Sequence, residues 1–338
     1  MAPRQPLLRT SHLTRTAAYA EPLLRTAASR RVLLLQALPL VSFCWPPLSA
    51  QAEPVLAPPL PPPPPPPPPA VVFRKVVTDP LFVRLRSRYI LFRPGETTFE
   101  AAGIVDSNPI NKQNADRGLT RRGREQVRKS TAALRERGVD SPIIFYDNGV
   151  RATQTADIIA SELSVPRASC EPEFRWLEAR GLGALEGKSL RDATAALRKL
   201  DVEDIDNRVD PTDDGTPSDS VNELFSRLRN TIGKIENTYG GGDFIIVAGD
   251  AAVLSVFAAA ACGVDLRQHE DFLLRPGEFY DLRELVPAVK EGRFEPMALR
   301  APTDEEITRG REALRQLGPK VFADTDAGSW VLGEGVLR

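Results

Sequence analysis

The feature that most restricts the fold is an alternation of short apolar runs with helical stretches between residues 88 and 282. The runs are rich in β-branched and aromatic residues and end at Gly, Pro or Asp, which is typical of buried strands. They cover 88–93, 141–146, 243–247 and 278–282. The helical stretches cover 120–138, 151–163, 189–200, 217–239 and 251–261. This alternation predicts a three-layer α/β sandwich with a doubly wound, mostly parallel sheet, in which functional groups collect at the carboxyl ends of the strands.

The chain also divides by composition. We assign residues 71–290 to the α/β domain and 291–338 to a C-terminal extension, with a helix at 303–317 and a Gly-rich tail around Trp330. The extension either covers the domain or recruits an unidentified protein partner.

Residues 1–52 have the composition of a targeting sequence. They contain six arginines and a single acid, Glu21, and Arg30-Arg31 open an apolar run that ends at Phe43 before a small-x-small site at Ala52. We interpret the segment as a bipartite transit peptide with a twin-arginine signal, cleaved after Ala52. It resembles the presequences of thylakoid-lumen proteins. A mitochondrial presequence and an uncleaved anchor are the alternatives, but the run is short and contains Pro39, so we expect no stable membrane span after processing.

Residues 53–70 form a proline-rich linker with nine consecutive prolines from Pro61. Such a tract adopts a stiff polyproline II helix that extends about 3.1 Å per residue. It is either a spacer or a ligand for an aromatic groove on a partner. The formal net charge of −1 and the lack of a clustered basic segment after residue 52 argue against nucleic-acid binding.

Five segments carry recognisable motifs. In order, Leu91–Thr97 reads LFRPGET, Leu119–Gln126 reads LTRRGREQ, Arg151–Ala156 reads RATQTA, Ala179–Gly187 reads ARGLGALEG and Ala248–Ala252 reads AGDAA. Their order and spacing resemble the histidine phosphatase superfamily, whose corresponding patterns are LVRHGET, LTxxGxxQ, RAxQTA, ERxxGALQG and VSHGG. The resemblance implies a phosphoglycerate mutase-like fold.

The resemblance also implies which residues carry the chemistry. In the family a first histidine attacks phosphorus, a second histidine and two arginines hold the transferring oxygens, and a carboxylic acid protonates the leaving group. Here Pro94 occupies the nucleophile position, Asp250 the position of the second histidine and Ala179 the position of the acid, with Glu178 one residue away. We therefore predict that no catalytic residue is intact and that no phosphohistidine forms.

Histidine content supports this prediction independently. The whole chain has two histidines, His12 and His269, and only His269 remains after the presequence. Next to Glu270 in a polar stretch, His269 is expected to be a surface residue. Ser218 and Ser220 are expected to cap the following helix.

Arg93 and Arg151 match the arginines that grip phosphate in the family. Two guanidinium groups at strand ends suit a phosphate or carboxylate ligand, with Glu96 and Glu178 as further candidates at this anion site. In the alternative interpretation, Arg93 forms an internal ion pair with Asp250.

No metal or other cofactor is predicted. Glu96 and Asp250, even when combined with Asp106 or Asp147, lack the spacing of a metal site. Cys170 and Cys262 either form one disulfide or remain two free thiols.

Two functional hypotheses follow. The first is a catalytically inactive histidine phosphatase-like protein of the thylakoid lumen that acts as a binding, scaffold or anion-sensing module. The alternative is a divergent phosphatase or phosphotransferase that acts on a phosphomonoester without a phosphohistidine.

Overall fold

The computed structural model describes residues 73–75, 79–173, 175–213, 215–300 and 302–317. The predicted transit peptide, the proline-rich linker and the tail around Trp330 lie outside the described residues.

A five-stranded sheet forms the centre of the domain, with strand order β3-β2-β4-β1-β5. Its strands are β1 (Arg88–Phe92), β2 (Ile143–Asp147), β3 (Cys170–Glu173), β4 (Asp243–Val247) and β5 (Phe279–Asp281). β4 pairs in parallel with both β1 and β2, β3 pairs in parallel with β2, and β5 alone is antiparallel. The predicted mostly parallel sheet is confirmed.

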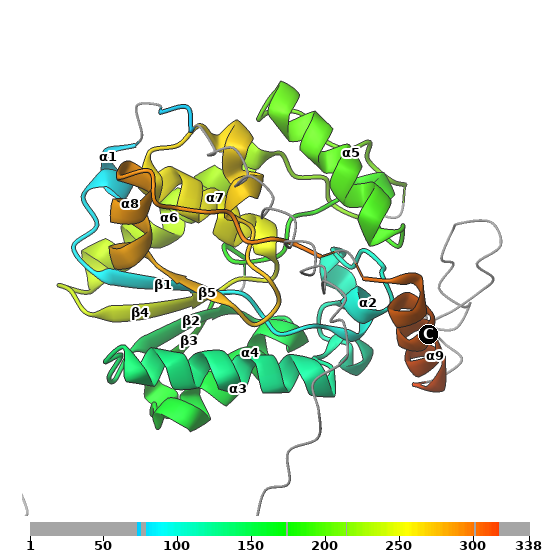
Figure 1. The fold of residues 1–338 in the computed structure, drawn as a ribbon, viewed down its shortest axis with the longest axis horizontal. Helices are drawn as coiled ribbons and strands as arrows, with labels where there is room; N and C mark the ends of the chain where they lie inside the picture. The colour runs from blue at the N-terminus through cyan, green and yellow to red at the C-terminus, as the bar shows by residue number, and fades with distance from the viewer. Residues whose placement is uncertain (1–72, 76–78, 174, 214, 301, 318–338) are drawn as a thin grey trace, which may run out of the picture. The chain divides into compact units, whose positions relative to one another are not determined.

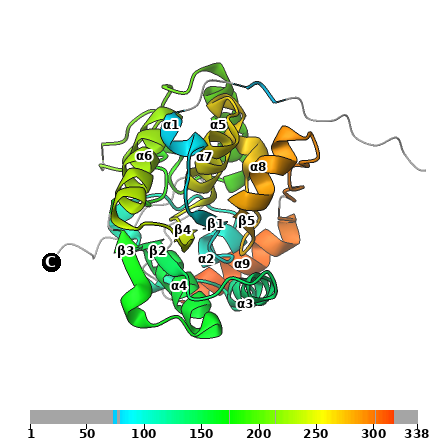
Figure 2. The ribbon, with the colours of Figure 1, turned by 90° about the vertical axis from the view of Figure 1, so that its left-hand side faces the viewer.

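Helices cover both faces of this sheet, as Figure 1 and Figure 2 show. On one face, α3 (Arg121–Glu136) and α4 (Val150–Leu163) bury Ile90 and Phe92. On the other face, Tyr89 and Leu91 pack in a core with α6 (Val221–Thr238) and α7 (Ala251–Cys262). Alternate residues of β1 thus point into different cores, which is the three-layer sandwich that the sequence predicts.

Several further elements complete the domain. The remaining helices are α1 (Pro80–Val83), α2 (Thr98–Ala101), α5 (Leu190–Glu203), α8 (Leu282–Lys290) and α9 (Asp304–Gln316). Short 3₁₀ turns lie at Pro109–Asn111, Ala115–Arg117, Arg167–Ser169, Gly183–Leu185 and Leu266–Phe272, the last of which is η5. None of the described helices is long and apolar enough to cross a bilayer. Cys170 and Cys262 are free thiols, and burial raises the pKa of Cys262 to about 12.

The helix α9 packs against α2, close to the first motif. Leu314 of α9 is fully buried with Phe99 and Ala102 in a small apolar cluster. Gly310 lies so close to α2 that a Cβ atom there would overlap the carbonyl group of Ala101. The helices therefore approach each other through glycine, and this packing holds α2 in place.

We predict that Gly310→Ala destabilises the protein by about 1–3 kcal/mol, because the new methyl group overpacks the α2–α9 contact. In an open helix position the same change would stabilise by up to about 1 kcal/mol. Gly233→Ala in α6 is the matched control, because its Cβ would meet only Leu81, at 3.9 Å. Urea unfolding of the two variants should give shifts of opposite sign; equal shifts would contradict the packing argument.

Candidate functional site

The motif residues lie together because the parallel strands end at one edge of the sheet. Arg93 and Pro94 follow β1, Asp147 ends β2 and Asp250 follows β4. The glycines of the first two motifs pack against each other, since a Cβ on Gly95 would overlap the backbone of Gly123. The predicted convergence of these segments is therefore correct.

Arg93 does not form the ion pair with Asp250 that the alternative interpretation gives it. Its Nη2 lies 2.6 Å from Oε1 of Glu100, and its Nη1 donates to the carbonyl of Leu274. Glu100 is positioned by a capping box with Thr97 at the start of α2. Burial would raise the pKa of Glu100, but Arg93 and the Thr97 N–H outweigh it and lower the pKa. The sequence shows the capping box but does not show that its carboxylate reaches Arg93.

Asp250 is the N-cap of α7. Its Oδ1 accepts a hydrogen bond from the Val253 N–H at 3.1 Å, and its Oδ2 accepts one from the Arg180 N–H at 2.9 Å. At this position the carboxylate satisfies backbone donors of a helix start and of the loop after β3.

Arg151, the second predicted anion ligand, is held by Asp106. Its Nη2 donates to the Asp106 carbonyl at 2.9 Å and lies 3.7 Å from Asp106 Oδ2. Burial would lower the pKa of Arg151, but the surrounding carboxylates, Asp106 foremost, raise it. Asp106 also pairs with Arg117, so this ion-pair network is continuous.

A lysine outside the five motifs, Lys112, lies between two acids. Lys112 forms an ion pair with Glu178, and its Nζ lies 3.5 Å from Oδ1 of Asp147. Asp147 is buried, with a side chain only 3% exposed, and this burial raises its pKa. Lys112 belongs to an irregular segment and to no motif, so no signal in the sequence indicated it.

Glu96 lies apart from this group. Its Oε2 accepts a hydrogen bond from the Thr120 hydroxyl at 3.0 Å, and its Oε1 is 3.6 Å from Arg122 at the start of α3. The structure therefore does not bring Glu96 together with Arg151 and Glu178.

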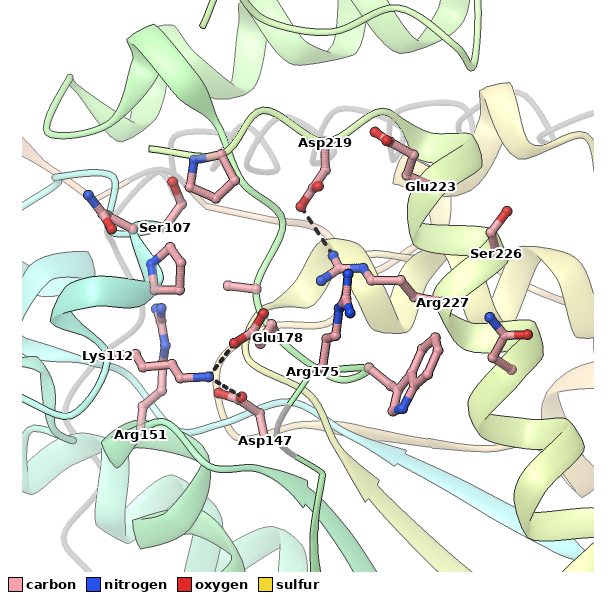
Figure 3. A pocket seen from close by; sticks show the side chains of 16 residues that line it. Ser107, Lys112, Asp147, Arg151, Arg175, Glu178, Asp219, Glu223, Ser226 and Arg227 are labelled. Atoms are coloured by element: carbon pink, nitrogen blue, oxygen red, sulfur yellow. Dashed lines mark hydrogen bonds and ion pairs between the residues drawn. The ribbon is translucent and has the colours of Figure 1, made fainter. Parts of the chain in front are cut away.

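A cavity of about 490 Å³ opens over the ends of β2 and β3 and beside α6 (Figure 3). It is lined by Ser107, Asn108, Pro109, Lys112, Asp147, Arg151, Arg175, Trp176, Glu178, Ala179, Pro217, Asp219, Glu223, Ser226, Arg227 and Asn230. Arg93, Pro94, Glu96 and Asp250 are not among these lining residues. Of the predicted positions, Arg151, Glu178 and Ala179 face the cavity, while the two histidine positions lie outside its lining.

His269 is buried and not a surface residue, so that expectation is wrong. Its segment η5 folds onto α7, where Nδ1 lies 2.8 Å from the Ser255 hydroxyl, and Nε2 lies 3.1 Å from Asp201. Arg180 makes a two-pronged ion pair with the same carboxylate, at 2.6 and 2.8 Å. Asp201, His269 and Ser255 are each at most 2% exposed, so this network is structural.

Ser220 caps α6 as predicted, but Ser218 does not, because its hydroxyl donates to the Val209 carbonyl. Among the described residues, no three His, Cys, Asp or Glu side chains are placed to hold a metal ion.

The family model of the histidine phosphatase superfamily, branch 1, matches residues 89–284, more than half of the chain. The chain belongs to this superfamily. Its fold is similar to that of the α-ribazole phosphatase from Shigella flexneri, at 21% identity and a TM-score of 0.44, covering 57% of this chain and 88% of that one. It is also similar to a mycobacterial glucosyl-3-phosphoglycerate phosphatase, at 18% identity and a TM-score of 0.42, covering 54% and 82%. The search of curated proteins finds no match.

Glu270, the acid next to His269, makes the stability of this superfamily member depend on pH. Burial raises the pKa of Glu270 from 4.5 to about 7, against the attraction of Arg198 at 3.7 Å. The folded protein therefore binds this proton more tightly than the unfolded chain. The stability that the protonated carboxyl contributes is fully present below about pH 4.5 and is lost as the pH rises through about 7.

We expect Glu270→Gln to remove this loss, so that from acid to neutral pH the wild type loses roughly 2–4 kcal/mol of unfolding free energy relative to the variant. Denaturant unfolding across this range measures the difference. Glu203→Gln, at an exposed position of α5, is the control and should follow the wild type. Parallel profiles of wild type and Glu270→Gln would rule the effect out.

Proposed function

We propose that this superfamily member is a catalytically inactive binding module. The observation that carries the proposal is that each charged group retained at the site already has an internal partner. Arg93 pairs with Glu100, Arg151 with Asp106, and Glu178 with Lys112.

The position of the nucleophile supports the same conclusion. Pro94 is buried, and its ring nitrogen is a tertiary amide, which has neither a nucleophilic lone pair nor a proton to donate. The carboxylate of Asp250 would repel a phosphate dianion where the family places an imidazole. The one histidine within the family match, His269, is enclosed between Asp201 and Ser255.

One observation favours the alternative, a divergent phosphatase. Asp147 and Glu178 lie on either side of Lys112 and line the cavity together with Arg151. A buried carboxyl with a raised pKa beside an ammonium group is suited to proton transfer. This arrangement could activate water without a phosphohistidine.

We predict that the purified chain releases no phosphate from a panel of phosphomonoesters above the uncatalysed rate, because it lacks a nucleophile. Phosphate release and thermal stability would be followed in the same samples. Turnover that disappears in both Arg151→Ala and Asp147→Asn would overturn this proposal in favour of the divergent phosphatase. Arg229→Ala, an arginine of α6 outside the cavity, is the control for nonspecific loss of charge.

We further propose that this module works in the thylakoid lumen, with the mitochondrion as the alternative, on the basis of the composition of residues 1–52. The mature protein should begin at Glu53, because the small-x-small site ends at Ala52. N-terminal sequencing of the protein isolated from its native cells measures this. A start far upstream of Glu53 would contradict the twin-arginine signal.

A further inference from the structure

The basic side chains that line the cavity form two groups, as Figure 3 shows. Lys112, Asp147 and Arg151 lie on the side of β2, and Arg175 and Arg227 lie on the opposite side. On the β2 side the ion pairs with Glu178, Asp147 and Asp106 neutralise the cations, as described above. Little positive potential is left there for a ligand.

The opposite side is built from one face of α6 and the loop after β3. Glu223, Ser226, Arg227 and Asn230 recur at helical spacing, so they share one face of α6, and all four line the cavity. Arg175 belongs to the loop and is exposed. These side chains are polar and face open space and not the core.

Among the described residues, one arginine on this side of the cavity has no carboxylate partner. Glu223 is neutralised by Arg208 at 2.9 Å. Asp219 pairs with Arg227 at 3.3 Å and also accepts a hydrogen bond from the Gly181 N–H at 2.8 Å. Among the residues that the structure describes, no carboxylate forms an ion pair with Arg175. Arg208, which pairs with Glu223, is not among the lining residues, so of the two arginines that line this side Arg175 is the one without a carboxylate partner in the described part of the chain.

Trp176 adds an apolar surface next to this charge. Its half-buried indole lines the cavity directly after Arg175 in the chain. Ser226 and Asn230 supply a hydroxyl and an amide on the same side. The volume of about 490 Å³ suits a small organic molecule, because ligand pockets span roughly 300–1,000 Å³.

We infer that anion binding in this chain has moved to the α6 side of the cavity, where Arg175, Arg227 and Trp176 form a site for a small carboxylate with a flat apolar body. The guanidinium group of Arg175, which has no carboxylate partner among the described residues, matches a single negative charge. A phosphate dianion would bring a second negative charge toward Glu178 and Asp147 on the other side. The arginine fork binds the carboxylate, and the indole contacts the apolar body. This inference rests on the proposed function, since it names the ligand class of the binding module.

Isothermal titration calorimetry of the full chain at constant ionic strength tests the site. The probes are benzoate, acetate with the charge but no ring, benzyl alcohol with the ring but no charge, and inorganic phosphate. Benzoate should bind more tightly than the other three. Arg175→Gln and Trp176→Ala should each weaken benzoate binding about 10-fold or more. The first variant removes the ion pair with the carboxylate, and the second removes the contact between the indole and the ring.

Two further arginine variants locate the bound anion. Arg229→Gln, on the same helix but outside the cavity, should bind benzoate as the wild type does. Arg151→Gln distinguishes the two sides of the cavity and should change the affinity less than Arg175→Gln. Arg175 is exposed, so its replacement leaves the core intact.

The possible failures are distinguishable. A preference for inorganic phosphate, or affinity lost in Arg151→Gln but kept in Arg175→Gln, would return the anion to the family position and overturn the inference while the binding module stands. No measurable binding of any probe would also overturn it. Turnover of phosphomonoesters, in contrast, would overturn the proposed function itself.

Discussion

The parallel pairing of β4 with both β1 and β2 is the constraint on which the whole site depends. In this register Val247 lies opposite Phe92 on one side and opposite Tyr146 on the other. The residues that follow these three positions therefore leave the sheet at the same level, although they come from distant parts of the chain. Any side chain placed directly after these strands must find its partner at this edge, whether that partner is a ligand or another residue of the protein.

Here the partners come from the protein. Arg93 and Arg151 have side chains only 15% and 11% exposed, and a partly buried guanidinium group is unfavourable without a counter-charge. Glu100 and Asp106 supply that charge. A phosphate entering at Arg93 would have to displace a carboxylate that is fixed by the capping box of α2, and α2 is itself fixed by α9. The C-terminal helix thus supports the internal ion pair, although it lies outside the part of the chain that matches the family.

The sequence was sufficient to predict the architecture, because hydrophobic periodicity and turn residues determine it locally. The predicted strands and the longer helices have the expected positions within a few residues. β3 was missed because Cys170–Glu173 is a polar edge strand that contains Pro172. The helix α8 was missed because Pro287 lies inside it, where proline usually ends a helix.

The site was predictable only in part, because ion pairs depend on which side chains meet in space. The motifs located Arg93, Arg151 and Asp250 correctly at the sheet edge. Their partners Glu100 and Asp106 lie outside the five motifs, and the capping box that contains Glu100 does not show that its carboxylate reaches Arg93. His269 has polar neighbours in the chain, and only the packing of η5 against α7 and α5 buries it, beside Ser255 of α7 and Asp201 of α5.

Asp250, which stands where the sequence pattern of the family has its second histidine, helps to hold one wall of the cavity. Asp250 accepts a hydrogen bond from the Arg180 N–H, the Gly249 N–H donates to the Leu177 carbonyl, and the Arg180 guanidinium is bound by Asp201. These bonds fix the loop after β3 at the end of β4. The same loop carries Arg175, Trp176 and Glu178 into the cavity wall. Asp250 therefore helps to anchor the loop that carries these three side chains, together with the Gly249 N–H and the Arg180–Asp201 ion pair.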